Sequence, residues 1–247
     1  MAELYDEIGQ HYDTYRRPDP RIAAAIAEAL GPEGRVVNVG AGTGSYEPRD
    51  CPVVAVEPSH AMIRQRPPGG GRAVQASATA LPFCDAAFDV ALAVLTIHHW
   101  PDRARGLAEL MRVAPRAVIL TWDPDSAGFW LVDDYFPEIA ALDRPIFPTM
   151  DELRRILGRV EVRPVPVPYD CADGFLGAYW RRPHAYLDAG VRGAISTFTK
   201  VAALEAPLQR LRRELEDGTW TRRYGHLMDR TEMDLGYRLV VASGAGR

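Results

Sequence analysis

Three glycines and an acidic residue form the pattern in this sequence that points most clearly to chemistry. Gly40, Gly42 and Gly44 follow a short run of valines, and Glu57 follows the next apolar run. Glycines at this spacing allow positive φ angles and let a ligand lie against main-chain N–H groups. An acidic side chain at the end of the neighbouring strand can accept hydrogen bonds from both hydroxyls of a ribose. Together these features predict a site for a nucleoside-containing ligand.

The spacing of the glycines distinguishes between two such ligands, a dinucleotide and S-adenosylmethionine. A dinucleotide fingerprint has glycine at its sixth position, where this sequence has Ser45. The connection from Gly44 to Val53 is also too short for a long helix whose N-terminus would bind a pyrophosphate. We expect at most two helical turns there. The pattern therefore favours S-adenosylmethionine, and an NAD(P)-dependent oxidoreductase is the alternative enzyme.

Four motifs between Tyr5 and Asp123 resemble the class I S-adenosylmethionine-dependent methyltransferases, nearest the ubiquinone-biosynthesis and trans-aconitate methyltransferase type. The motifs are Val36–Gly44, Val54–Ser59 with Met62, Gln75–Phe83, and Phe88–Trp100. The resemblance implies that a methyl group passes from S-adenosylmethionine to a small-molecule acceptor, with S-adenosylhomocysteine as the product. It leaves the acceptor molecule and its O, N or C atom open.

The resemblance also implies which residues hold the cofactor. The glycine loop would wrap the methionine part and the ribose, Glu57 would bind the ribose hydroxyls, and an N-terminal segment would fold over the ligand. The remaining contacts would be to the adenine ring, its amino group and the amino end of the methionine part. The full set is Tyr12, Arg16, Gly40, Ala41, Gly42, Gly44, Glu57, Pro58, Met62, Ser77, Ala78 and Leu95. Asn38 stands where the family usually has an acid, and Ser77 replaces a common Asp; a nonenzymatic nucleoside-binding protein is therefore an alternative.

Two side chains could act as a base at the carboxyl edge of the expected sheet. Methyl transfer depends mainly on in-line alignment, and a base is needed only when the nucleophile carries a proton at neutral pH. His99 and Asp123 each follow a predicted strand at the edge where open α/β sheets bind ligands. The alternatives are a packing role for His99 and a turn-capping role for Asp123.

Aromatic residues after the fifth and sixth strands could form an acceptor pocket. Aromatic rings next to arginine suit a planar or acidic small molecule. The alternatives are a hydrophobic core and an amphipathic helix with solvated arginines. We expect a partly enclosed pocket whose substrate-binding residues are His99, Trp122, Phe129, Trp130, Tyr179, Trp180 and Arg181.

Composition limits the other function classes. With 29 Lys and Arg against 33 Asp and Glu, the net charge is −4, whereas a general nucleic-acid surface is basic. We therefore expect no nucleic-acid partner, although methylation of RNA or protein is an alternative. No apolar stretch is long enough to span a membrane and no leader segment is visible, so a cytoplasmic location is expected. Three scattered cysteines and no ligand cluster predict no metal site. Composition leaves the oligomeric state open.

The elements that must position these residues follow the pattern of a doubly wound α/β fold. We expect a mostly parallel, seven-stranded sheet, because continuous Val- and Leu-rich runs alternate with helical segments. Residues 1–247 would form one domain, with helical insertions at about 122–148 and 169–233 that form a substrate lid. A helix kinked near Pro207 is expected at 192–215. Further helices are expected at 21–30, after Ser59, at 102–113 and at 150–157; the strands are expected at 36–39, 53–56, 73–75, 88–95, 117–121, 160–167 and 236–242.

Overall fold

The computed structural model describes residues 15–32 and 34–244, and within them the main sheet has seven strands in the order β3-β2-β1-β4-β5-β9-β6. The first five strands in this order, from β3 to β5, pair in parallel. Strand β9 is antiparallel to both of its neighbours. The expected mostly parallel, doubly wound sheet is therefore confirmed. The strands are β1 (Val36–Val39), β2 (Val53–Val56), β3 (Arg72–Val74), β4 (Val90–Val94), β5 (Arg116–Trp122), β6 (Val160–Pro164) and β9 (Tyr237–Ser243).

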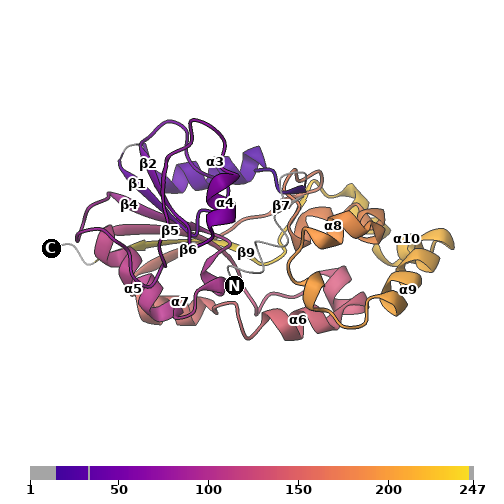
Figure 1. The fold of residues 1–247 in the computed structure, drawn as a ribbon. Coiled ribbons are helices and arrows are strands. Elements are labelled where there is room, and N and C mark those ends of the chain that lie inside the picture. The colour runs from indigo at the N-terminus through magenta and orange to yellow at the C-terminus, as the bar shows by residue number, and fades with distance from the viewer. Residues whose placement is uncertain (1–14, 33, 245–247) are drawn as a thin grey trace.

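Helices cover both faces of the sheet (Figure 1). Helix α3 (Pro20–Leu30) packs on one face, and α5 (Arg103–Val113) and α7 (Met150–Leu157) pack on the other. The β-branched strands are buried because they face a helix layer on each side. Thr149 caps the start of α7, its hydroxyl accepting from the Glu152 N–H at 3.1 Å. The short helix α4 (His60–Arg64) begins after Ser59, as expected.

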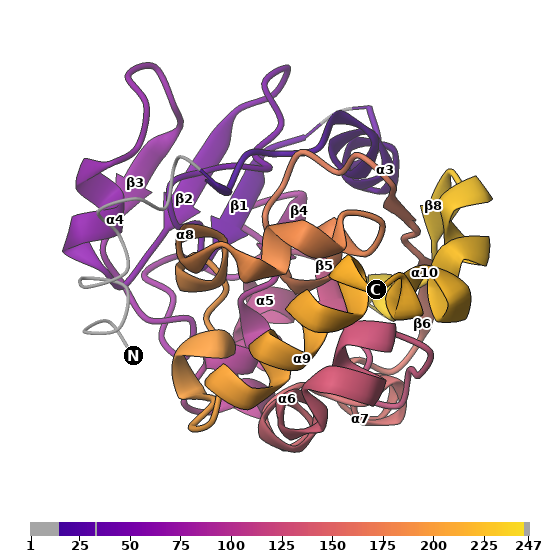
Figure 2. The same cartoon turned by 90° about the vertical axis from the view of Figure 1, so that its right-hand side faces the viewer.

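Helical segments extend the molecule beyond the carboxyl ends of the parallel strands (Figures 1 and 2). After β5 the chain forms a π-helical turn (Leu131–Tyr135) and α6 (Pro137–Asp143). After β6 it forms α8 (Ala189–Gly193), α9 (Glu205–Glu216) and α10 (Thr219–Tyr224). The small pair of β7 (Val167–Pro168) and β8 (Glu232–Met233) joins the two ends of this second segment. Both segments therefore lie at the edge of the sheet where α/β proteins bind ligands.

The expectation of one kinked helix over 192–215 is wrong. Helix α8 ends at Gly193, and α9 begins only at Glu205. Between them lies a 3₁₀ turn, in which Phe198 is buried with its ring 5.2 Å from that of Phe136. Pro207 falls in the first turn of α9, where a missing N–H breaks no helical hydrogen bond. Among the described residues, no helix is both long and apolar enough to cross a membrane.

Candidate active site

A cavity of about 380 Å³ lies between the carboxyl ends of the strands and the helical segments. One end is lined by the glycine loop and the residues that follow β2, β3 and β4. The other end is lined by residues of the two helical segments and by the histidine pair after β4. A concave, mostly apolar space with a few polar groups is typical of a small-molecule site.

Residues 40–44 turn sharply after β1 in backbone conformations that favour glycine. Gly40, Gly42 and Gly44 have φ angles of 71°, 52° and 88°. A Cβ on Gly40 would also lie only 2.0 Å from the Oγ1 atom of Thr96. The loop therefore needs glycine for its conformation and, at Gly40, for close packing.

Glu57 is buried at the end of β2, where its carboxylate holds the glycine loop. One carboxylate oxygen accepts a hydrogen bond from the Gly42 N–H at 2.8 Å, and the other accepts from the Ser59 N–H at 2.9 Å. Burial raises the pKa of Glu57, and these N–H groups and the nearby Arg66 only partly oppose that rise. The carboxylate keeps further lone pairs with which it can accept hydrogen bonds from a ligand.

Four other predicted cofactor residues line the same end of the cavity. Pro58 and Met62 come from the start of the α4 region, and Ser77 and Ala78 follow β3. Met62 is buried, and its methyl carbon would lie 3.5 Å from a Cβ on Gly42. The Ser77 hydroxyl is 2.8 Å from the hydroxyl of Thr79. The apolar surface and the polar group suit a flat heterocycle with an amino substituent.

Asn38 and Leu95 also line the cavity. The Asn38 amide donates to Glu47 at 3.0 Å, while its Oδ1 atom is buried and has no partner among the described residues. Leu95 has a φ of 48°, a strained conformation for a residue other than glycine. A buried acceptor without a donor is costly, so the Asn38 oxygen fits the ammonium group of a ligand.

Glu47 and Arg66 brace the glycine loop, and the sequence analysis did not identify them. Their ion pair is nearly buried at 2.5 Å, and the Arg66 guanidinium also donates to the Gly42 carbonyl at 3.3 Å. The chain from Gly44 to Val53 contains no helix, which lies within the expected limit of two helical turns.

The two histidines after β4 both line the cavity and are held in their neutral forms. Burial lowers the pKa of His99 to about 4 and the pKa of His98 well below its ordinary value. The His98 ring stacks on Phe147 with ring centroids 3.9 Å apart. Its Nδ1 atom is buried without a partner among the described residues. Neutral imidazoles at this position can accept a proton or orient an acceptor.

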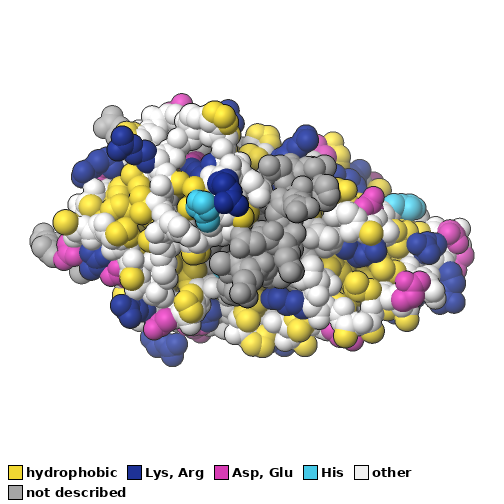
Figure 3. Space-filling view, viewed as in Figure 1, with side chains coloured by type: hydrophobic (Ala, Val, Ile, Leu, Met, Phe, Trp, Pro, Cys, Tyr) yellow, Lys and Arg dark blue, Asp and Glu magenta, His cyan; other side chains and the backbone are white. Residues whose placement is uncertain are grey.

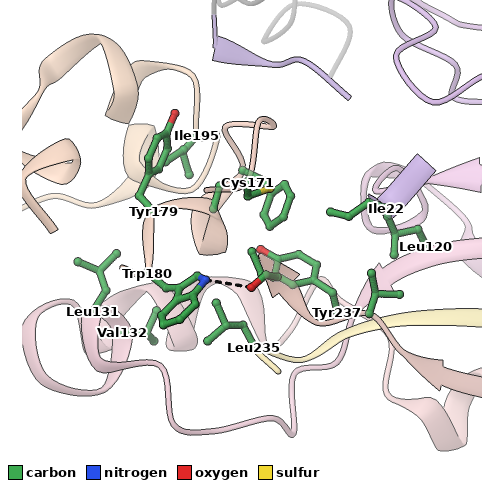
Figure 4. Packing of buried hydrophobic residues seen from close by; sticks show 14 of the residues in the cluster. Ile22, Leu120, Leu131, Val132, Cys171, Tyr179, Trp180, Ile195, Leu235 and Tyr237 are labelled. Carbon is green, nitrogen blue, oxygen red and sulfur yellow. Dashed lines mark hydrogen bonds between the residues drawn. The ribbon is translucent and has the colours of Figure 1, made fainter. Parts of the chain in front are cut away.

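Several residues expected in the acceptor pocket lie elsewhere, which corrects that part of the sequence interpretation. Trp130 and Trp180 belong to the hydrophobic core of the helical segments, where their indole N–H groups donate to backbone carbonyls at 2.8 and 3.0 Å. Figure 4 shows Tyr179 and Trp180 in that core. Phe129 packs against the same core, and the half-buried Arg181 donates to the Arg230 carbonyl. These side chains fill the helical segments rather than face the cavity.

Of the two candidate bases, only His99 lines the cavity. Asp123 caps its own turn by accepting from the Asp125 N–H at 3.2 Å, and its carboxylate lies 3.9 Å from Arg238. Trp122 does line the cavity, as expected. Other aromatic residues line the cavity without having been predicted there, among them Phe147, Phe175 and Tyr237. The sequence gives only a weak indication that these three residues line the cavity, because each lies in a segment whose position depends on tertiary packing.

The N-terminal part of the described chain contributes Arg16 to the cavity. Its guanidinium lies 2.6 Å from the buried carboxylate of Asp173, which also accepts from the Tyr46 hydroxyl at 2.9 Å. The Asp173 carboxylate of the second helical segment thus joins the N-terminal side of the chain, through Arg16, to the segment after the glycine loop, through Tyr46. Tyr12, the other predicted N-terminal contact, lies outside the described residues.

Comparison with known proteins identifies the family. Residues 37–120 match a family described as a methyltransferase domain. A solved structure from Anabaena variabilis ATCC 29413, described as a methyltransferase from an antibiotic biosynthesis pathway, is 33% identical with a TM-score of 0.84, and the alignment covers 92% of this chain and 98% of that chain. This chain belongs to the methyltransferase family. Its use of S-adenosylmethionine and the narrower ubiquinone or trans-aconitate subtype stay predictions.

Curated relatives match only part of the methyltransferase. An uncharacterized methyltransferase of Mycobacterium sp. (strain KMS) is 39% identical over 89 residues, which is 33% of this chain and 35% of that protein. The tRNA (carboxymethyluridine(34)-5-O)-methyltransferase alkbh8 of Xenopus tropicalis is 28% identical over 132 residues, or 49% of this chain and 21% of that protein. This chain therefore spans about a third or less of the length of these two relatives, and they do not identify its acceptor.

Proposed function

We propose that the methyltransferase binds S-adenosylmethionine at the glycine-loop end of the cavity and methylates a small molecule held at the other end. The observation that carries this proposal is that one cavity is lined by both sets of residues. Open α/β sheets bind their ligands at this edge. The helical segments at 122–148 and 169–233 would then act as the substrate lid.

The residues around the cavity suit distinct parts of such a reaction. When bound, S-adenosylmethionine supplies an electrophilic methyl carbon. Asn38 Oδ1 and the backbone of Leu95 would orient the amino end of its methionine part, and Glu57 would accept from the ribose hydroxyls. His99 would accept a proton from the acceptor or hold it in line, since its lowered pKa keeps the imidazole neutral at pH 7.

An RNA acceptor is a second candidate because one partial relative is named as a tRNA methyltransferase. The surface offers less support for it. On the face shown in Figure 3, basic and acidic side chains are interspersed rather than separated into one basic patch. The net charge of −4 also gives little attraction to phosphate.

Two measurements test the proposal. Titration calorimetry should detect S-adenosylhomocysteine binding, with no comparable binding of NADH. Formation of S-adenosylhomocysteine should then increase when a small-molecule metabolite fraction is added and should not increase with bulk tRNA. Binding without turnover in any fraction would favour the nonenzymatic alternative, and turnover with tRNA that weakens steeply with salt would favour the RNA acceptor.

A further inference from the structure

Asp143, at the end of α6, is a buried carboxyl group in the acceptor end of the cavity. Its side chain lines the cavity and is only 4% exposed. Both carboxylate oxygens lie 3.0 Å from the same donor, the hydroxyl of Thr197. One hydroxyl carries one hydrogen, so it cannot satisfy both oxygens at once. The described part of the chain therefore leaves Asp143 with capacity for another hydrogen-bond donor.

No cation in the described residues forms an ion pair with this carboxylate. The charge of Lys200 acts on Asp143 from an exposed position without bonding to it, and Arg144 beside it is also exposed. Arg16, the arginine of the cavity lining, is held by Asp173. The two histidines of the lining are neutral at pH 7 and contribute no positive charge. Within residues 15–32 and 34–244, the negative charge of Asp143 therefore has no ion-pair partner.

The walls of this end are aromatic. Phe147 stacks on His98 and lies edge-on to Trp122 at 5.3 Å between ring centroids. Phe175 and Tyr237, whose ring centroids are 4.6 Å apart, also line the cavity. Aromatic faces attract cations as well as flat apolar groups. An apolar molecule with a positive end would match both the walls and the carboxylate.

We propose that Asp143 is the acceptor-recognition residue, and that the acceptor is a small, largely apolar molecule with a basic nitrogen whose N–H groups donate to this carboxylate. The inference rests on the proposed function, because it takes the opposite end of the cavity as the cofactor site. The burial cost of an unbalanced charge is offset when the ligand brings the counter-charge. The same charge repels an acidic acceptor. Of the planar or acidic molecules that the sequence suggested, the acidic ones are therefore excluded.

Three isosteric probes test the charge preference. Phenethylamine, 2-phenylethanol and phenylacetate would each be titrated into the protein saturated with S-adenosylhomocysteine, with calorimetric detection. We expect phenethylamine to bind at least about tenfold more tightly than the alcohol, since hydrogen bonds to charged groups are the stronger ones. Phenylacetate should show no measurable binding.

Variants at Asp143 and at nearby or control positions test whether this carboxylate causes the preference for the amine. In Asp143→Asn the amine-to-alcohol ratio should fall to about one, because the amide keeps the shape and removes the charge. Glu138→Gln makes the same change at an exposed position of the same helix and should leave the ratio unchanged. Thr197→Val removes only the hydroxyl donor and should keep the amine preference. Asp143→Ser is a second variant should Asp143→Asn not fold.

The outcomes separate this inference from the proposed function. S-adenosylhomocysteine is titrated first and alone, and failure of that binding overturns the proposed function. If it binds while the wild-type protein shows no amine preference, prefers phenylacetate, or binds none of the probes, the Asp143 inference fails by itself. Retention of the amine preference in Asp143→Asn and Asp143→Ser would also overturn it.

Discussion

Glu57 combines two roles that are often separate, since its carboxylate supports the glycine loop and also faces the cavity. The Gly42 and Ser59 N–H groups each bond to one of its oxygens. A ribose bound there would add donors to a carboxylate whose position the protein has already fixed. Preorganisation of this kind lowers the cost of binding.

Removal of that carboxylate should therefore weaken ligand binding. We expect Glu57→Ala to weaken S-adenosylhomocysteine binding by about 1–3 kcal/mol, the scale of lost hydrogen bonds to a charged group. The measurement is titration calorimetry on protein shown to be folded by circular dichroism. Glu28→Ala, at an exposed site on α3, is the control and should bind normally. Unchanged affinity in folded Glu57→Ala would remove Glu57 from the ribose site.

Asp143 should give the protein an unusual pH dependence of stability. Burial raises the pKa of Asp143 from 3.8 to about 6, although the Thr197 hydrogen bond and the charge of Lys200 oppose this. The folded state then binds the proton more tightly than the unfolded state, so this residue's stabilising contribution is lost as pH rises from about 4 to 6. A shift of this size corresponds to about 3 kcal/mol.

The difference between the wild type and Asp143→Asn isolates this effect. Free energies of unfolding from urea titrations at pH 4, 5, 6 and 7 should show the wild type losing stability relative to the variant as pH rises. Other titrating groups are common to both proteins and cancel in the difference. A constant difference over this range would mean that Asp143 has an ordinary pKa in the folded state.

At the level of elements, the glycine loop shows how backbone conformation and packing combine. Gly40 and Gly69 both have positive φ angles, 71° and 87°. A Cβ on Gly40 would clash with Thr96, whereas a Cβ on Gly69 would meet nothing within 4 Å. A side chain at Gly69 would therefore cause backbone strain alone, whereas a side chain at Gly40 would cause both backbone strain and a steric clash.

Alanine at these two glycines should have unequal effects. Gly69→Ala should cost about 1–2 kcal/mol of stability, the strain of a left-handed L-residue. Gly40→Ala should cost more, because Thr96 or the loop must also move, and it should lower S-adenosylhomocysteine affinity. Thermal denaturation and calorimetry of both variants provide the comparison. Equal losses of stability would show that Thr96 or the loop moves to accept the added methyl group at no cost in free energy.

Helices, strands and turns that depend on residues close together in the sequence could be predicted. Contacts between segments far apart in the sequence could not. The strands, the helix that follows Thr149 and the glycine loop follow from local patterns of apolar residues, caps and turns. Trp130 and Trp180 lie in the core rather than in the predicted pocket, because aromatic composition does not reveal which way a side chain faces. Asp143 has a local signal in the sequence, since it falls on the buried face of α6 with Ile139. Its partner Thr197 depends on tertiary packing alone.

Across the whole molecule, one buried network joins three parts of the chain. Asp173 contacts Arg16 from the N-terminal side and Tyr46 from the segment after the glycine loop. Asp19 also accepts from the Ala172 N–H at 3.0 Å. The position of the second helical segment over the sheet is thus linked to charged contacts as well as to apolar packing.

Breaking this network should loosen the cavity. We expect Asp173→Ala to reduce the free energy of unfolding by about 3–5 kcal/mol, because Arg16 and Tyr46 lose a buried partner. Asp170→Ala removes an acid of the same segment whose ion pair with Arg21 is half-exposed, so its effect should stay below about 1 kcal/mol. Urea unfolding of both variants is the measurement. A similar small effect in both would mean that the network adds little to the apolar packing.

The placement of β9 between β5 and β6 has a consequence for how the chain assembles during synthesis. Among the strands of the described residues, β6 pairs with β9 alone, and β9 leaves the ribosome after all of residues 165–236. The parallel strands β1 to β5 and the aromatic core of the helical segments can form earlier, while β6 has no edge to join. Pairing over such a separation closes slowly. The edge of β5 thus stays open to wrong partners until β9 arrives, and during this interval the nascent chain is most exposed to mispairing.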